Sequence, residues 1–310
     1  LKKIIDFFFP INLTGCSNDS VDPVDPNSIT FENLKWTFQV TGNNGQDNWF
    51  ANNEQQGYNK ENAMLITNSQ GNKELKVTIR KVIENGVTYY KSSRLEMQEK
   101  VSDLKLERGT KLSVEFIGKL PIAKNINGDF VNNVPLWPAF WMMGTGIWDG
   151  TSSWPNCGEI DVMEWASTKL INNNIINTSK EYSTAFHFAN SNNEHSYISK
   201  NFCSDSIDQN YHRFKTVIYR DTNDNGKIEM FFDGEKIHDY FLDINKTGLH
   251  KELIYEYNSQ GEEINNTYKY YGLLINIALS GNYTGNAIIP SDFNMAEMFI
   301  KNVNVEKVFL

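Results

Sequence analysis

Hydrophobic and polar residues alternate with a period of two in short runs along most of the chain. Residues 75–80, 111–116 and 214–219 each alternate in this way, which is typical of β-strands with one buried face. Clusters of Asn and Gly separate such runs, as at 43–45 and 125–128, and these clusters favour turns. Helical periodicity lasts no longer than a turn or two. The pattern predicts an all-β protein, a jelly-roll sandwich of two antiparallel sheets.

One Asn-rich turn has the opening spacing of a calcium-binding loop. Residues 221–226 read D-T-N-D-N-G, but the twelfth position of the loop, which should be a bidentate Glu, is Phe232. The better interpretation is a turn that joins two strands, with Asn and Gly supplying positive φ angles. We expect no bound metal and no cofactor.

The N-terminal segment differs from the rest of the chain. Lys2 and Lys3 precede a short apolar run, and residues 13–16 read L-T-G-C, as in a secretory signal. This ending resembles a bacterial lipobox, which implies lipidation of Cys16. Residues 17–28 are polar and contain two Pro, as in a flexible tether. We expect a signal segment at 1–16, a linker at 17–28 and a single β-sandwich domain at 29–310.

Composition narrows the possible partners. The 310 residues carry a net charge of -9, with 40% hydrophobic and 13% aromatic residues. No basic stripe is present to meet phosphates, which argues against nucleic acid, and no apolar run is long enough to span a membrane. We expect an exported monomer that reaches a membrane only through a lipid anchor, at the bacterial cell surface or outer membrane, or else secreted. Of the remaining cysteines, Cys157 and Cys203, we expect no bridge, although export permits one.

Three carboxylates occupy one strand-like segment, residues 158–165, which read G-E-I-D-V-M-E-W. Period two places Glu159 and Asp161 on one face and Glu164 on the other. A β-bulge near Val162 would return Glu164 to the face of the first two. Paired carboxylates on one face suit a retaining glycosidase, with one as nucleophile and the other as acid. A metal site or a solvated strand face are the alternatives, and spacing alone does not say which Glu has which role.

Several segments in order resemble glycoside hydrolase family 16, in its bulged, laminarinase-like form with E-x-D-x-x-E. The segments are 52–58, 93–94, 136–144, 154–164, 231–234 and 274–282, and the resemblance extends over about 31–308. It implies a substrate cleft on the concave sheet, with Glu159 as nucleophile, Glu164 as acid/base and Asp161 as the assisting acid. It also implies cleft positions for Asn53, Glu54 and Arg94, and for His187 beside the nucleophile.

Aromatic residues near the acids suit a sugar polymer, because indole rings stack on the apolar faces of glucose. Period two puts Trp137 and Trp141 on one face, and Trp154 comes shortly before the acids. We expect all three in the cleft, although core packing is the commoner fate of a large aromatic. Two departures from the family are Lys301, where an Asp helps to bind calcium, and Tyr283, where a Trp is usual.

The leading interpretation is an endo-acting, retaining β-1,3-glucanase that acts on laminarin-type glucan. A hydrolase of mixed-linkage glucan or of marine galactan is a second possibility. A transglycosylase or a non-catalytic glucan-binding protein on the same fold are others, but relatives of the last kind lose the catalytic acids and this chain keeps all three.

Overall fold

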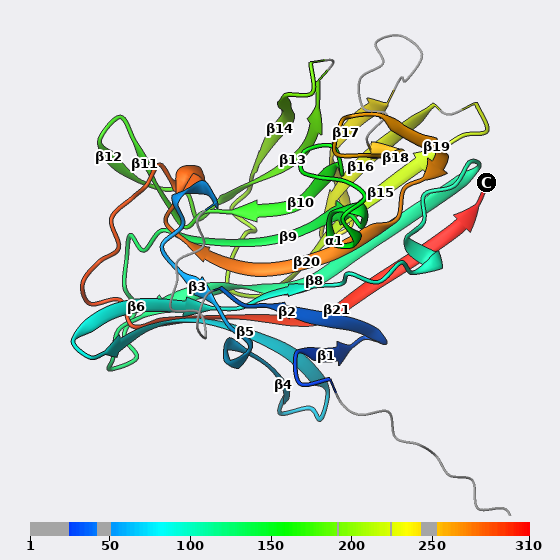
Figure 1. Cartoon of the computed structure of the whole chain (residues 1–310). Helices are drawn as coiled ribbons and strands as arrows, with labels where there is room; N and C mark the ends of the chain where they lie inside the picture. The colour runs from blue at the N-terminus through cyan, green and yellow to red at the C-terminus, as the bar shows by residue number, and fades with distance from the viewer. Residues whose placement is uncertain (1–24, 42–50, 191, 224, 243–252) are drawn as a thin grey trace, which may run out of the picture.

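The structure is a computed structural model, which describes residues 25–41, 51–190, 192–223, 225–242 and 253–310. Two large sheets are stacked in layers (Figure 1). Nearly all strand pairs are antiparallel, and the all-β jelly-roll architecture predicted from the alternation is confirmed. Within the described residues, no helix is long and apolar enough to cross a membrane.

The first sheet has eight strands and carries the acid segment near one side. Its order is β1 (Ser28–Phe31), β2 (Leu34–Gln39), β7 (Arg94–Glu96), β20 (Tyr271–Leu279), β9 (Leu136–Gly144), β10 (Glu159–Trp165), β13 (Glu181–Ala189) and β14 (His195–Cys203). β10 therefore lies between β9 and β13, with strands β20 and β14 beyond them.

The second sheet has nine strands. Its order is β17 (Glu235–Leu242), β16 (Gly226–Phe232), β15 (Tyr211–Arg220), β8 (Thr110–Lys124), β21 (Met295–Phe309), β5 (Lys73–Glu84), β6 (Val87–Ser92) and β3 (Gly57–Tyr58), with β4 (Ala63–Thr67) paired to β5. The runs at 75–80, 111–116 and 214–219 lie in β5, β8 and β15, so these three strand predictions are confirmed.

Small elements lie in the connections between strands of the two sheets. They are two ribbons, β11 (Thr168–Ile171) with β12 (Asn174–Asn177) and β18 (Tyr255–Tyr257) with β19 (Glu263–Tyr268), one turn of helix, α1 (Gly146–Asp149), and the single-turn helices η1 (Ala51–Asn53), η2 (Lys60–Asn62), η3 (Ser102–Leu104) and η5 (Asn282–Thr284). The β11–β12 ribbon follows β10 directly in the chain and projects beside the first sheet (Figure 1).

The hydrophobic core fills the space between the two sheets, as the alternation requires. Ile160 and Met163 of β10 face this core, together with Phe140 of β9 and Phe116 of β8. The rings of Phe140 and Phe116 stack with centroids 4.9 Å apart. Burial of this kind contributes about 25 cal/mol for each Å² of apolar surface, so the core-facing residues fix which side of β10 turns outward.

The N-terminal boundary differs slightly from the prediction. β1 begins at Ser28, the last residue of the predicted linker, because Ser28 pairs with Thr37 of β2. Cys16 and the signal segment lie outside the described residues.

Two other sequence predictions can be checked in the fold. A hairpin joins β15, which ends at Arg220, to β16, which begins at Gly226, and in this connection the Asp221 carboxylate accepts hydrogen bonds from the backbone of Asn223 and Asn225. The hairpin is thus confirmed, but the described residues Asn223, Asn225 and Gly226 do not have the positive φ expected of them. Cys157 is buried, Cys203 is exposed, and the structure has no disulfide between them.

Candidate active site

A β-bulge in β10 brings the three carboxylates to one face. Opposite β13, Asp161 pairs with Ala185 and Glu164 with Ser183, so two residues of β10 oppose one of β13. Opposite β9, the pairing passes directly from Asp161 to Met163. Val162 is therefore the extra residue, and the bulge predicted near it is confirmed. We call the side of the sheet that carries Glu159, Asp161 and Glu164 the acid face.

Indole donors hold the two outer carboxylates. Trp154 Nε1 donates to Glu159 Oε2 at 3.0 Å, and Trp137 Nε1 donates to Glu164 Oε1 at 3.1 Å. Trp154 is 43% exposed, so its ring is open to a ligand. Each outer carboxylate thus has its own aromatic neighbour with a defined hydrogen bond, which restricts its rotation.

His187 contacts the first two acids of the row, Glu159 and Asp161. It lies opposite Glu159 in β13, and its Nε2 is 3.1 Å from Asp161 Oδ2 and 3.8 Å from Glu159 Oε1. Its Nδ1 is 2.8 Å from Nε2 of His195, a residue of β14. His187 therefore places a ring nitrogen between the first and second acids, which the sequence predicted only as a family resemblance.

Burial is the largest cause that raises the pKa of all three acids, to about 8 in each case. The negative charge of Asp161 also raises the pKa of Glu159 and Glu164, whereas His187 lowers both. A hydrogen bond with Glu159 lowers the pKa of Asp161. Two carboxyl groups can share such a bond only when one is protonated, so the row ionises stepwise. One acid can then be charged while another keeps its proton at neutral pH.

The loop before β10 is tied down by a buried lysine. Lys269 is fully buried, and its Nζ donates to the carbonyl oxygen of Cys157 and lies 3.9 Å from Glu256 Oε2. At Gly144 of the neighbouring strand, a Cβ atom would be 2.1 Å from the same carbonyl. Only glycine fits there, and this close approach fixes the chain just before Glu159.

The other predicted site residues lie along the acid face or at its end. Trp141 pairs with Asp161 in the sheet and is 9% exposed, with its Nε1 donating to Asn276 Oδ1 at 2.8 Å. The Arg94 guanidinium stacks over the Trp141 ring at 4.7 Å and donates to Glu96 at 2.7 Å. The structure therefore makes Trp141 and Arg94 part of the floor of the acid face.

Asn53 and Glu54 lie at the connection that carries η1. Asn53 Nδ2 donates to Asn282 Oδ1 at 2.8 Å. Glu54 is 7% exposed, and its Oε2 accepts hydrogen bonds from Gln56 and from the Tyr58 hydroxyl. Burial is the main cause that raises the pKa of Glu54. In this structure the Glu54 carboxyl is thus engaged by the protein itself.

Sequence reasoning missed several neighbours of the acids. His195 packs on the Trp154 ring with centroids 4.4 Å apart, and Tyr197 stacks on His187 at 5.6 Å. Lys169 of β11 lies over the ring of Tyr283 at 4.1 Å. The alternation of β14 could have flagged His195 and Tyr197 as facing one side, whereas no sequence signal links Lys169 to the acids.

One group of described side chains has the composition of a metal site. The ligand atoms of Glu159, Asp161 and His187 all lie within 4.8 Å of one another. A cation bound there would occupy two of the three acids of β10. The sequence prediction of no metal is not tested by this geometry.

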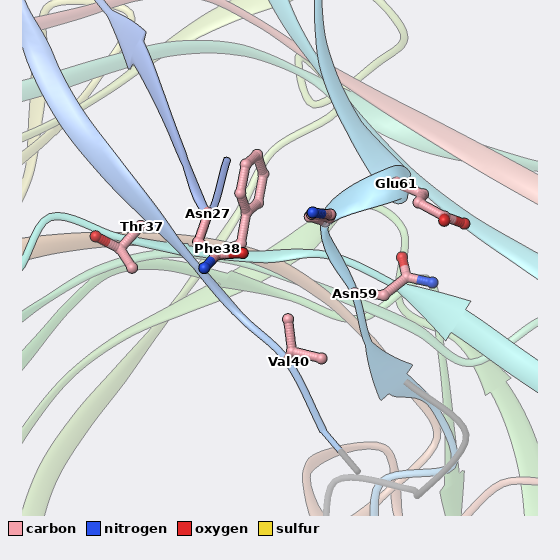
Figure 2. A pocket seen from close by; sticks show the side chains of 7 residues that line it. Asn27, Thr37, Phe38, Val40, Asn59 and Glu61 are labelled. Atoms are coloured by element: carbon pink, nitrogen blue, oxygen red, sulfur yellow. The ribbon is translucent and has the colours of Figure 1, made fainter. Parts of the chain in front are cut away.

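A separate cavity lies beside β2 and η2 (Figure 2). In the first sheet, β2 is next to the edge strand β1, whereas β10 lies towards the opposite edge. The cavity measures about 480 Å³ and is lined by Asn27, Thr37, Phe38, Val40, Asn59, Lys60 and Glu61. β7, β20 and β9 separate β2 from β10 in the sheet. Among the described residues that line the cavity, Glu61 is the single carboxylate, so they offer no acid pair.

Comparisons with known proteins agree with this architecture. Residues 130–229 match a family model described as the XgeA-like catalytic domain of glycoside hydrolase family 16, a region that includes β9, β10 and β13. Among the curated proteins, none matches the chain.

Solved structures share the fold at low identity. A family 16 endo-glucanase from Bacteroides ovatus is 22% identical, with 91% of this chain and 98% of that chain covered and a TM-score of 0.60. The laminarinase catalytic domain of Thermotoga maritima is 23% identical, with 91% and 92% covered and a TM-score of 0.56. An endo-1,3-β-glucanase from Streptomyces sioyaensis is 19% identical, with 89% and 90% covered and a TM-score of 0.64.

Proposed function

We propose that the chain, which matches a catalytic-domain model of glycoside hydrolase family 16 over residues 130–229, is an endo-acting, retaining hydrolase of β-1,3-glucan. The observation that carries the proposal is the bulge at Val162, which brings Glu159, Asp161 and Glu164 to one face. Two carboxyl groups on one face, one charged and one protonated, are the requirement of double displacement.

The first step forms a glycosyl-enzyme. The Glu159 carboxylate attacks the anomeric carbon, the glycosidic C–O bond breaks, and the Glu164 carboxyl gives its proton to the leaving oxygen. In the second step Glu164 takes a proton from water, whose oxygen attacks the same carbon and releases Glu159. Asp161 holds the proton that it shares with Glu159, and by that bond it orients the nucleophile.

Aromatic groups at both ends of the acid row support a polymeric substrate. Trp137 stacks on Tyr283 at 5.0 Å beside Glu164, and Trp154 packs on His195 beside Glu159. Rings of this kind offer apolar faces to sugars on either side of the bond to be cleaved. Binding across both ends would favour internal cleavage of a long chain.

Mixed-linkage glucan is the second candidate substrate. The Bacteroides ovatus enzyme with this fold is described as part of a mixed-linkage glucan locus, in complex with the product G4G4G3G. Tyr283 in place of the usual Trp offers a smaller stacking surface, so the preference between the two glucans depends on more than the acids.

Product analysis tests the proposal. Purified protein is incubated with laminarin, lichenan, agarose and carrageenan, and early products are followed by proton NMR. We expect laminarin to give internal fragments whose β-anomer appears first, because two inversions restore the configuration. If the α-anomer appears first, double displacement is excluded. Preferential cleavage of lichenan would favour the mixed-linkage alternative.

We also propose that the enzyme works outside the cell as a monomer, held at a bacterial membrane surface by lipid on Cys16. The L-T-G-C sequence and the polar segment 17–28 support this proposal. A tether there would allow the acid face to reach a polymer too large to enter the cell.

A further inference from the structure

Lys169 lies at the Glu164 end of the acid row, on the ribbon that follows β10. Its Nζ is 4.1 Å from the centroid of the Tyr283 ring and 3.7 Å from Glu181 Oε1. Only 15% of its side chain is exposed. An ammonium over an aromatic face is attracted by the negative charge of that face, so Tyr283 and Glu181 together keep Lys169 in one place.

Tyr283 connects this lysine to Glu164. Its hydroxyl donates to the backbone oxygen of Glu164 at 2.8 Å and is 2.9 Å from Ser183 Oγ, the residue opposite Glu164 in β13. Trp137 also stacks on Tyr283, and it donates to the Glu164 carboxylate. Lys169, Tyr283 and Trp137 therefore form a stack that holds both the backbone and the side chain of Glu164.

The ribbon is fixed against η5 by a close backbone contact. Gly285 has a φ of 69°, and a Cβ atom on it would be 2.1 Å from the carbonyl oxygen of Leu170. Leu170 is the neighbour of Lys169, so β11 packs directly on the turn that carries Tyr283. The position of Lys169 is thus set by main-chain packing as well as by its own side chain.

The titratable groups around Glu164 come from four elements. They are Glu159 and Asp161 of β10, His187 and Glu181 of β13, Lys169 of β11 and Tyr283 of η5. Burial and the charge of Asp161 raise the pKa of Glu164, whereas His187, the Trp137 hydrogen bond and Lys169 lower it. Lys169 is the single lysine among these groups.

We propose that Lys169 is a positioning residue for Glu164: together with Tyr283 and Trp137 it holds this carboxyl in place, and its positive charge favours the ionised form. The proposal rests on the proposed function, in which Glu164 protonates the leaving oxygen. A residue in the ribbon, outside the acid face, would then contribute to the alkaline limit of the reaction.

The pH dependence of kcat/KM tests this on the full chain. The alkaline limb reports ionisation of the general acid in the free enzyme. Lys169→Met removes a positive charge, so Glu164 should hold its proton more strongly and the limb should move up by roughly 0.5–1 pH unit. Lys169→Arg keeps the charge and should restore a limb close to that of the parent. A limb that does not move, or moves down, in Lys169→Met overturns the proposal.

A matched control is available in the other sheet. Lys227 lies 4.5 Å over the Tyr219 ring and 2.9 Å from Glu229 Oε1, so it repeats the lysine–tyrosine–glutamate arrangement away from the acids. Lys227→Met should leave the limb in place. An equal shift in this variant would show a general charge effect and would contradict a specific role for Lys169.

A second variant keeps the test valid if Lys169→Met folds poorly. Glu181→Gln removes the negative partner of Lys169 and leaves the ammonium, so the limb should move down. Shifts of the same sign in Glu181→Gln and Lys169→Met would overturn the proposal. Thermal unfolding of each variant separates loss of fold from a change in protonation.

A carboxyl titration separates this proposal from the proposed function. In protein labelled with ¹³C at the Glu carboxyl, the Glu164 signal is assigned through Glu164→Gln and titrated without substrate. We expect a higher midpoint in Lys169→Met than in the parent. If the parent cleaves none of the glucans, the proposed function fails, and this titration still decides for or against Lys169.

Discussion

His187 Nε2 lies 3.1 Å from Asp161 Oδ2 and thereby joins β13 to the middle acid of β10. The same nitrogen is 3.8 Å from Glu159 Oε1. The His187 ring thus contacts two acids. In the proposed reaction, Glu159 is the nucleophile and Asp161 orients it. Removal of the ring should affect the protonation of the row more than the fold, because His187 lies on the outer face of the sheet.

Replacement of His187 by Gln should shift the acidic limb of kcat/KM upward. His187 lowers the pKa of Glu159, and the nucleophile must be ionised, so loss of the ring raises the pH at which Glu159 becomes charged. We expect kcat to fall on the order of 10²-fold, the usual cost of one stabilising donor. A pH–rate profile over roughly pH 4–9, a range that covers the titration of perturbed carboxyl groups, measures both effects. An acidic limb that moves down would contradict the assignment.

The two outer acids should have separable roles. Glu159→Ala should regain turnover with added azide and form a glycosyl azide of inverted configuration, because azide replaces the nucleophile. Glu164→Ala should retain more activity on aryl glycosides with good leaving groups, which need no protonation. Rates and product configuration check both variants, with Glu61→Ala, from the cavity beside β2, as the control. Identical responses of the two variants to azide would show that the roles are wrongly assigned.

Lys269→Met should destabilise the protein strongly. The substitution leaves Glu256 buried without its cationic neighbour, which costs about 3–5 kcal/mol of unfolding free energy. Denaturant unfolding measures the loss. The double variant Lys269→Met/Glu256→Gln removes both charges and should recover part of it. If the double variant is less stable than Lys269→Met alone, the ion pair is not the source of the effect.

Cys16→Ser tests the proposed anchor. The parent should fractionate with membranes and take up labelled palmitate, and the variant should lose both properties, because acyl chains supply the membrane affinity. Cys203→Ser, which removes an exposed thiol of the domain, is the matched control. A Cys16→Ser variant that stays on membranes and still takes up palmitate would exclude the anchor.

Local patterns were sufficient for the strands and the acid face. Period two placed Ile160 in the core, and the return of Glu164 to the face of Asp161 required one extra residue in the strand between these two acids. The β15–β16 turn followed from Asn and Gly in the same way. These features depend on neighbours in sequence, so the sequence contains the information that determines them.

Contacts between distant segments were beyond such reasoning. Lys169 meets Tyr283 across more than a hundred positions, and Lys269 meets the Cys157 carbonyl in the same manner. The hydrogen bonds that Gln56 and Tyr58 donate to Glu54 join residues close in sequence. They depend on the burial of a turn, which the alternation of hydrophobic and polar residues does not predict. Such contacts between side chains depend on how the segments pack in three dimensions, and a pattern in one sequence does not predict that packing.

The extra residue at Val162 gives this strand an unusual tolerance to changes in length. In a regular strand, deletion of one residue turns every later side chain to the opposite face. Here, deletion of Val162 would leave Met163 facing the core and Glu164 on the acid face, because Val162 is the residue without a partner in β9. Deletion of this one residue would therefore change the spacing from E-x-D-x-x-E to E-x-D-x-E and would keep all three acids on the same face. Its cost would be the apolar contacts of Val162, which is 2% exposed.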